Sequence, residues 1–161
     1  MKGAAIIGLF PNQILYRISP ITVAVNNYEY LEENDEFKSL EEDEDGNSLY
    51  LKYKKFVERA KSVKTNDIIE KVIRPINETT NIYYSFEEKE EINEKDMQLL
   101  DTLDIPQSNL PIANRTLIVS MKFSNYINVT VMDKEADKGN GKISFHKIHF
   151  IKYYFIKNFI S

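Results

Sequence analysis

The chain has 161 residues, of which 42% are hydrophobic and 29% are charged, and this suits one domain with a packed core. It contains no cysteine, which excludes disulfides and thiolate metal sites. Its two histidines, His146 and His149, have no evident third ligand nearby, so we expect no metal and no cofactor. The net charge of -4 argues against a general nucleic-acid binder, which would carry a basic surplus.

The N-terminal part of the chain predicts strands and then an acidic loop. Residues 14–18 and 21–25 have β character on either side of Pro20, and the second stretch alternates large and small residues as a half-buried strand does. Residues 32–45 carry a run of acids against the single base Lys38. Because such a block repels itself and lacks the ligand spacing of a calcium loop, we expect a solvated loop.

An amphipathic helix is predicted over residues 50–63, where apolar residues recur at helical spacing and charged residues fill the positions between them. The apolar positions are Tyr53, Phe56, Val57, Ala60 and Val63.

The rest of the chain is dominated by short strand patterns. Strands are predicted over residues 67–74, 81–86, 116–123, 126–132 and 142–145, and the last three, joined by short turns, form a meander. Residues 97–105 show no clear preference between helix and strand. Frequent strands with few helices favour a mainly β, antiparallel domain.

Several stretches share their order and spacing with one known family. They read Gly-Ala-Ala-Ile at 3–6, Leu-Tyr-Arg-Ile-Ser-Pro-Ile-Thr-Val-Ala-Val at 15–25, Val-Ile-Arg-Pro-Ile-Asn-Glu-Thr-Thr-Asn-Ile at 72–82, Leu-Pro-Ile-Ala-Asn-Arg at 110–115, Ile-Asn-Val-Thr-Val-Met-Asp-Lys at 127–134 and Lys-Ile-Ser-Phe at 142–145. Together they resemble the heat shock protein 70 chaperones, from the end of the ATPase domain through the interdomain linker into the β-sandwich that binds peptides.

The resemblance implies a domain organisation in three parts. Residues 1–18 are similar to the end of the ATPase domain and the linker, and residues 19–145 to the antiparallel β-sandwich, with an acidic loop and helix inserted at 27–64. Residues 146–161 form an aromatic and basic tail that does not resemble the family's helical lid.

The resemblance also implies site residues, because family members hold an extended peptide in an apolar pocket roofed by two loops. The positions that match the pocket walls are Val25, Ile68, Phe86 and Tyr126. The positions that match the interdomain linker are Leu15, Tyr16, Arg17 and Ile18.

The implied function is ATP-independent binding of extended or unfolded polypeptide. The family's ATPase motifs are absent from this chain, so we expect no catalytic residues and no enzyme. Co-chaperones or an ATPase domain are the further partners implied, with no nucleic acid and no membrane span, in the cytoplasm. Two alternatives stay open: a non-catalytic fragment without a specific ligand, and a module that docks a partner through the predicted helix.

Three departures from the family pattern weaken the expected binding. Arg17 stands where the family linker has an acid. Between Thr80 and Glu87 there is room for only one strand, where the family has a strand, a loop and a second strand, so we expect the loss of one pocket wall. The lid that slows peptide release is missing. Asp133 and Lys134 match a family motif, and we expect them in a turn after a strand.

Overall fold

The structure, a computed structural model, describes residues 16–30, 40–42, 45–90, 92–124, 126–134 and 143–148. These residues form short strands and two 3₁₀ helices. In chain order they are β1 (Tyr16–Ile18), β2 (Thr22–Tyr30), β3 (Leu40–Glu42), β4 (Ser48–Val57), β5 (Ser62–Lys64), β6 (Ile68–Ile73), β7 (Thr79–Ser85), η2 (Glu94–Asp96), β8 (Gln98–Asp104), η3 (Ile112–Asn114), β9 (Leu117–Phe123), β10 (Ile127–Asp133) and β11 (Ile143–Ile148).

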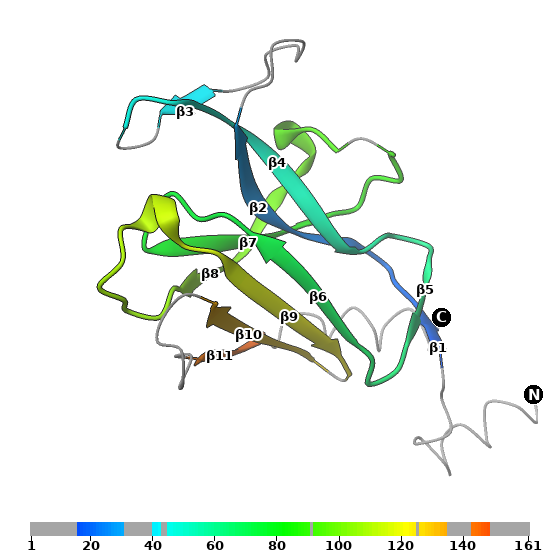
Figure 1. The fold of residues 1–161 in the computed structure, drawn as a ribbon. Coiled ribbons are helices and arrows are strands. Elements are labelled where there is room, and N and C mark those ends of the chain that lie inside the picture. Colours follow the sequence, from blue (N-terminus) through cyan, green and yellow to red (C-terminus); the bar gives the residue numbers. More distant parts are fainter. Residues whose placement is uncertain are drawn as a thin grey trace, which may run out of the picture.

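Two antiparallel sheets lie against each other (Figure 1). One has the strand order β3-β4-β2-β7-β8 and the other the order β11-β10-β9-β6, while β1 and β5 form a separate two-stranded ribbon. The mainly β, antiparallel prediction is therefore confirmed, and the arrangement is that of a β-sandwich. The predicted meander is also confirmed, since β9, β10 and β11 are neighbours in that order.

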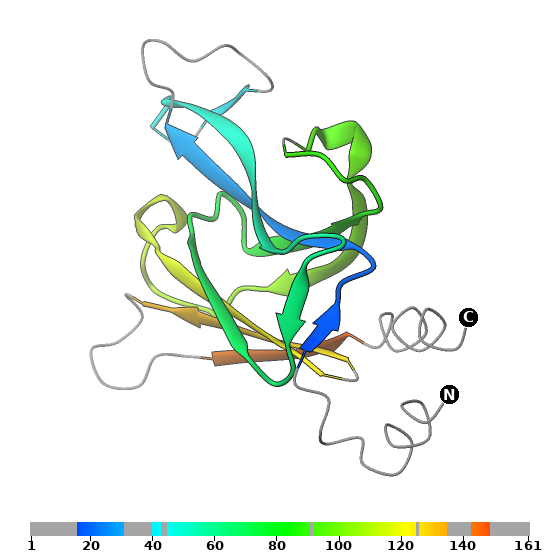
Figure 2. The ribbon, with the colours of Figure 1, turned by 90° about the vertical axis from the view of Figure 1, so that its right-hand side faces the viewer.

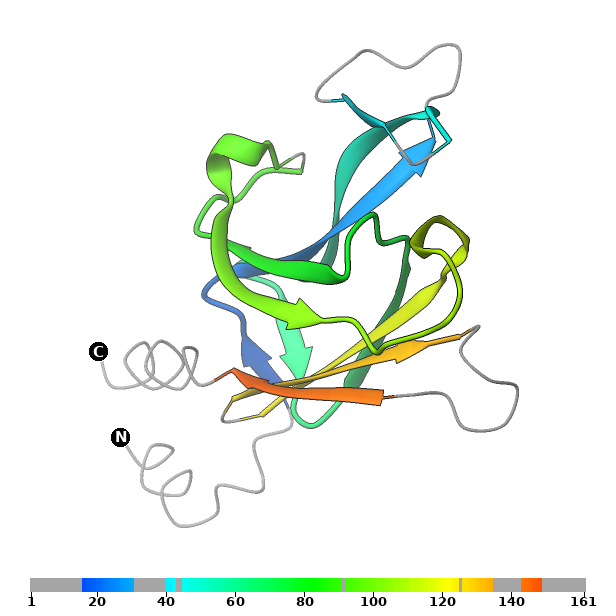
Figure 3. The same ribbon diagram turned by 90° about the vertical axis from the view of Figure 1, so that its left-hand side faces the viewer.

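The core lies between the two sheets and follows from strand alternation. Along β9 and β10 every second residue is buried, and the residues between are half-buried. The five-stranded sheet contributes Val23 and Val25 from β2 with Ile82 from β7 and Leu103 from β8, all fully buried in the same cluster. Figure 3 shows the two sheets facing each other across this core.

The predicted helix over residues 50–63 is wrong, because residues 48–57 form β4, which pairs along β2. The register shifts between Val23 and Ala24, which face Val57 and Lys55, so Phe56 is the extra residue of a β-bulge. The bulge leaves Phe56 and Val57 both buried in the core. Together with Tyr53, these two residues have the spacing of one helix face. The described residues of the range 27–64 contribute strands, and none of them forms the predicted helix.

The prediction of a single strand between Thr80 and Glu87 is confirmed, because β7 is the one strand within these residues. Residues 98–104, which lie in the stretch without a clear preference between helix and strand, form β8, which pairs antiparallel with β7. The register of this pair shifts between Ile82 and Tyr83, so apolar residues of β8 do not alternate strictly. This pairing gives β7 an antiparallel partner on the side away from β2.

Candidate functional site

The four residues predicted as pocket walls are spread over the molecule. Val25 is fully buried in the core, whereas the Ile68 side chain at the start of β6 is 60% exposed. Phe86 follows β7, and its ring meets that of Tyr84 edge-on. Tyr126 is half-buried beside the turn between β9 and β10. None of the four lines either of the two hollows described below.

The linker-like segment lies against the sandwich itself. In β1, Tyr16 pairs with Lys64 and Ile18 with Ser62. Arg17 donates a hydrogen bond from Nη1 to the carbonyl oxygen of Ser124, at 3.1 Å, in the turn after β9. The basic residue at this position thus anchors β1 to the four-stranded sheet. Leu15 lies outside the described residues.

A hollow of about 480 Å³ opens between β4 and β6, where edges of the two sheets approach each other, and we call it the β4–β6 cleft. The ribbon of β1 and β5 borders it, and Figure 2 shows these two strands side by side. Its floor is apolar, formed by Phe56, Val57, Val63 and Ile69. Its remaining lining is mainly charged: Tyr16, Lys55, Glu58, Lys61, Ser62, Lys64, Asp67 and Lys71.

One backbone edge of β6 lies beside this cleft, which takes Ile69 and Lys71 of this strand into its lining. In the part of the chain that the structure describes, β6 pairs with β9 alone. Lys54 on β4 donates a hydrogen bond from Nζ to the carbonyl oxygen of Val72, at 2.7 Å. The main-chain groups of Val72 therefore point away from β9, and those of Glu70, two residues earlier, point the same way. Glu70 thus offers a backbone N–H and C=O to an added strand.

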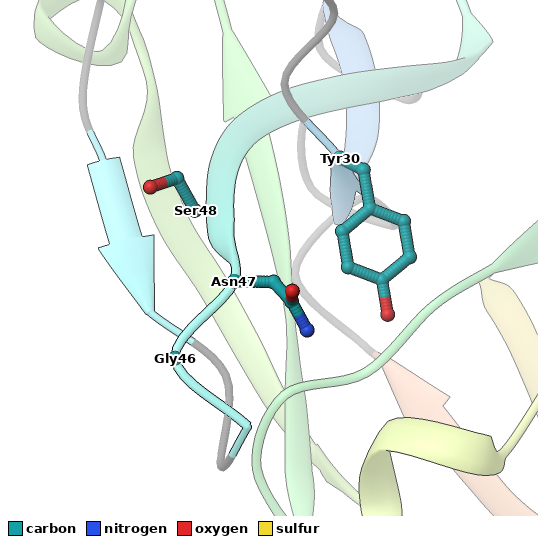
Figure 4. A pocket seen from close by; sticks show the side chains of 4 residues that line it. All are labelled: Tyr30, Gly46, Asn47 and Ser48. Atoms are coloured by element: carbon teal, nitrogen blue, oxygen red, sulfur yellow. The ribbon is translucent and has the colours of Figure 1, made fainter.

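A second hollow, of about 660 Å³, lies between the end of β2 and the turn before β4. Tyr30, Gly46, Asn47 and Ser48 line it (Figure 4), and the Tyr30 ring carries the Arg74 guanidinium 4.3 Å from its centroid. Tyr30 is the one large ring among the described lining residues, and these residues provide no apolar floor for a buried side chain.

A tyrosine pair lies on the outer face of the five-stranded sheet. The Tyr53 and Tyr83 rings meet edge-on, 5.3 Å between centroids. On the same strand as Tyr53, Lys55 donates a hydrogen bond from Nζ to the carbonyl oxygen of Glu90, at 2.6 Å, and so ties down the loop after β7. Burial, with smaller contributions from Tyr83 and Glu94, raises the pKa of Tyr53 to about 12. A phenol with this pKa stays neutral and is a poor base at pH 7.

We predict that Tyr53→Phe makes the folded protein less sensitive to alkali. The folded pKa of Tyr53, about 12, exceeds the ordinary value of about 10. The folded state therefore holds this proton more tightly, and stability is lost as pH rises from 10 through 12. After allowance for solvent screening the effect is about 1 kcal/mol. Urea unfolding at pH 8 and pH 11 checks this, with Tyr16→Phe on the surface as control. Equal alkaline losses in both variants would contradict it.

A buried ion pair joins two stretches that carry the family resemblance. Arg115, after η3, donates from Nε to Oδ2 of Asp133 at 2.6 Å, and both side chains are almost fully buried. The Arg115 Nη2 also donates to the carbonyl oxygen of Pro106. Asp133 is the last residue of β10, whereas a turn after the strand was predicted, and its partner was not predicted. The pair ties the loop before β9 to the end of β10, which is a structural role.

Several predicted features fall partly or wholly outside the described residues. They are the Gly-Ala-Ala-Ile stretch at 3–6, most of the acidic block at 32–45, the turn at 139–141, His149 and the tail beyond it. Within the described ranges no group of three or more His, Cys, Asp or Glu residues is placed to hold a metal ion. No helix in those ranges has the length and apolarity that a membrane crossing requires.

In comparisons with known proteins, no family model and no curated protein matches the chain.

Proposed function

We propose that the chain binds extended polypeptide without ATP, in the manner of a chaperone's substrate-binding domain, and that it does so at the β4–β6 cleft. The observation that carries the proposal is the backbone edge of β6 beside an apolar floor. A strand added to Glu70 gains main-chain hydrogen bonds, which are indifferent to sequence. Its alternate side chains point toward the cleft, where a central apolar residue reaches Phe56 and Val63.

The size and composition of the cleft fit this role. About 480 Å³ is enough for one large apolar side chain and parts of its neighbours, and lies in the range of ordinary ligand sites. The contact area is small, and binding must order the peptide, so the affinity is expected to be weak. Weak binding of many sequences is what a general binder of unfolded chains requires.

The resemblance to heat shock protein 70 supports the same function. The matching stretches fall on β2, on β6 and β7, before β9, and on β10 and β11, so they supply strands to both sheets. The ion pair between Arg115 and Asp133 joins two of the matching stretches.

We predict that Glu70→Pro weakens peptide binding about tenfold, because proline lacks the backbone N–H that an added strand needs. Proline is tolerated on sheet edges, and Glu70→Ala is the matched control, because it also removes the carboxylate that accepts a hydrogen bond from Ser120. Fluorescent heptapeptides with an apolar centre are titrated against each variant, and circular dichroism verifies the fold.

Equal affinities of the proline and alanine variants would show that the β6 edge is not the binding surface. Absence of saturable binding to the wild-type chain at high micromolar concentration would remove the function itself, and would favour the alternative of a non-catalytic fragment without a specific ligand.

A further inference from the structure

The charged rim of the β4–β6 cleft differs in sign from the protein as a whole. The chain carries a net charge of -4, yet the cleft is lined by four lysines and two acids. They are Lys55, Lys61, Lys64 and Lys71 with Glu58 and Asp67.

The lysines do not all have acidic partners. Glu58 lies 3.8 Å from the ammonium of Lys55, and Lys55 is also held by the loop after β7. Asp67 is the remaining carboxylate in the lining, against three lysines. Lys61 and Lys64 have exposed side chains, and no described carboxylate is paired with them. The rim therefore carries a surplus of positive charge.

The surplus is placed around the apolar floor. Along the chain, Lys61 precedes and Lys64 follows Val63, which is buried in the floor. Lys71 is two residues from Ile69 on β6. Side chains two positions apart on a strand point to the same side and are separated by about 7 Å. In a bound strand whose central residue faces the floor, the residues two positions before and after it therefore face the rim.

We infer that the preferred partner of this cleft is an extended segment with an apolar residue at its centre and acidic residues two positions to either side. This inference rests on the proposed peptide-binding function and adds to it a charge and a spacing. The carboxylates would meet the rim lysines at a partly exposed surface, where each pair contributes about two- to five-fold in affinity, and less at high salt.

Three heptapeptides of serine with a central leucine test the inference. The first has glutamate two positions to either side of leucine, the second has the same two glutamates adjacent to leucine, and the third has lysine in place of glutamate in the first. We expect the first to bind tightest, by about two- to five-fold for each well-placed glutamate, and the third to bind weakest.

Two charge-reversal variants localise the effect. Lys61→Glu combined with Lys64→Glu is expected to abolish the preference for the first peptide. Lys95→Glu combined with Lys134→Glu changes the net charge equally at two exposed lysines outside the cleft lining, and is expected to retain it.

The outcomes separate the two proposals. If all three peptides bind equally to the wild-type protein, the charge preference is overturned while the peptide-binding function stands. If none binds, both fail. Sedimentation of the protein alone provides a further outcome: a dimer that the cleft variant abolishes would mean that a second copy of the chain occupies the cleft, and would overturn the assignment to another polypeptide.

Discussion

Replacing Asp133 with asparagine is expected to lower the free energy of unfolding by about 3–5 kcal/mol. The Asp133 carboxylate is buried and lies 2.6 Å from the Arg115 Nε. Without the carboxylate, the Arg115 guanidinium remains buried, with the carbonyl of Pro106 as an acceptor but no opposite charge in the pair. A loss of this size is a large part of the total stability of a domain of this length. Urea unfolding followed by circular dichroism measures it.

A variant that lacks both charges identifies the cause. The combined variant Arg115→Met with Asp133→Leu removes both charges, and is expected to be far more stable than Asp133→Asn, since well-packed apolar residues often replace a buried ion pair without loss. Lys89→Gln, which removes an exposed partner of Asp96, serves as the surface control and should leave the unfolding midpoint unchanged. A small effect of Asp133→Asn would mean that water reaches the pair.

Leu103→Ala is expected to lower the free energy of unfolding by about 2–5 kcal/mol. Leu103 is fully buried on β8, within the core shared by the two sheets, so its truncation leaves a cavity. Leu99 lies on the same strand with its side chain 57% exposed, and Leu99→Ala is the matched control, with an expected change within about 0.5 kcal/mol.

This comparison tests whether β8 belongs to the sandwich. Similar unfolding midpoints for the two alanine variants would place β8 outside the cooperative core. A large loss for Leu103→Ala alone would establish β8 as a strand of the cooperative core.

Strands with regular alternation could be predicted from the sequence. In β9, the buried residues Leu117, Val119 and Met121 are separated by half-buried ones, and a short turn joins β9 to β10. Both features are local, so a window of a few residues contains the whole signal. The mainly β architecture follows from several such segments.

Bulges explain why β4 was predicted as a helix and why the β8 stretch showed no clear preference. In β4 the bulge buries Phe56 beside Val57, and two neighbouring buried residues imitate the spacing of a helix. In β8 the shifted register leaves Leu99 exposed and Leu103 buried, which breaks the period of two. A bulge depends on the partner strand, and the sequence of one strand alone does not reveal it.

Local sequence patterns could not predict the candidate site. The β4–β6 cleft is bounded by edges of different sheets, and the residues that form its floor come from β4, β5 and β6. Val25, predicted as a pocket wall, faces the core because β2 is covered by the other sheet. The partnership of Arg115 with Asp133 depends on the register of β9 and β10, which the two residues' own neighbourhoods do not encode.

The ribbon of β1 and β5 forms one side of the cleft, and this side can separate from the rest of the molecule. Only three residue pairs join its strands, and two-stranded ribbons of this length have little stability of their own. Tyr16, which lines the cleft, belongs to this weakly held strand. A force applied at Tyr16 would act on these three pairs and on the hydrogen bond from Arg17 to Ser124, and their loss would widen the entrance of the cleft while the two sheets stayed paired.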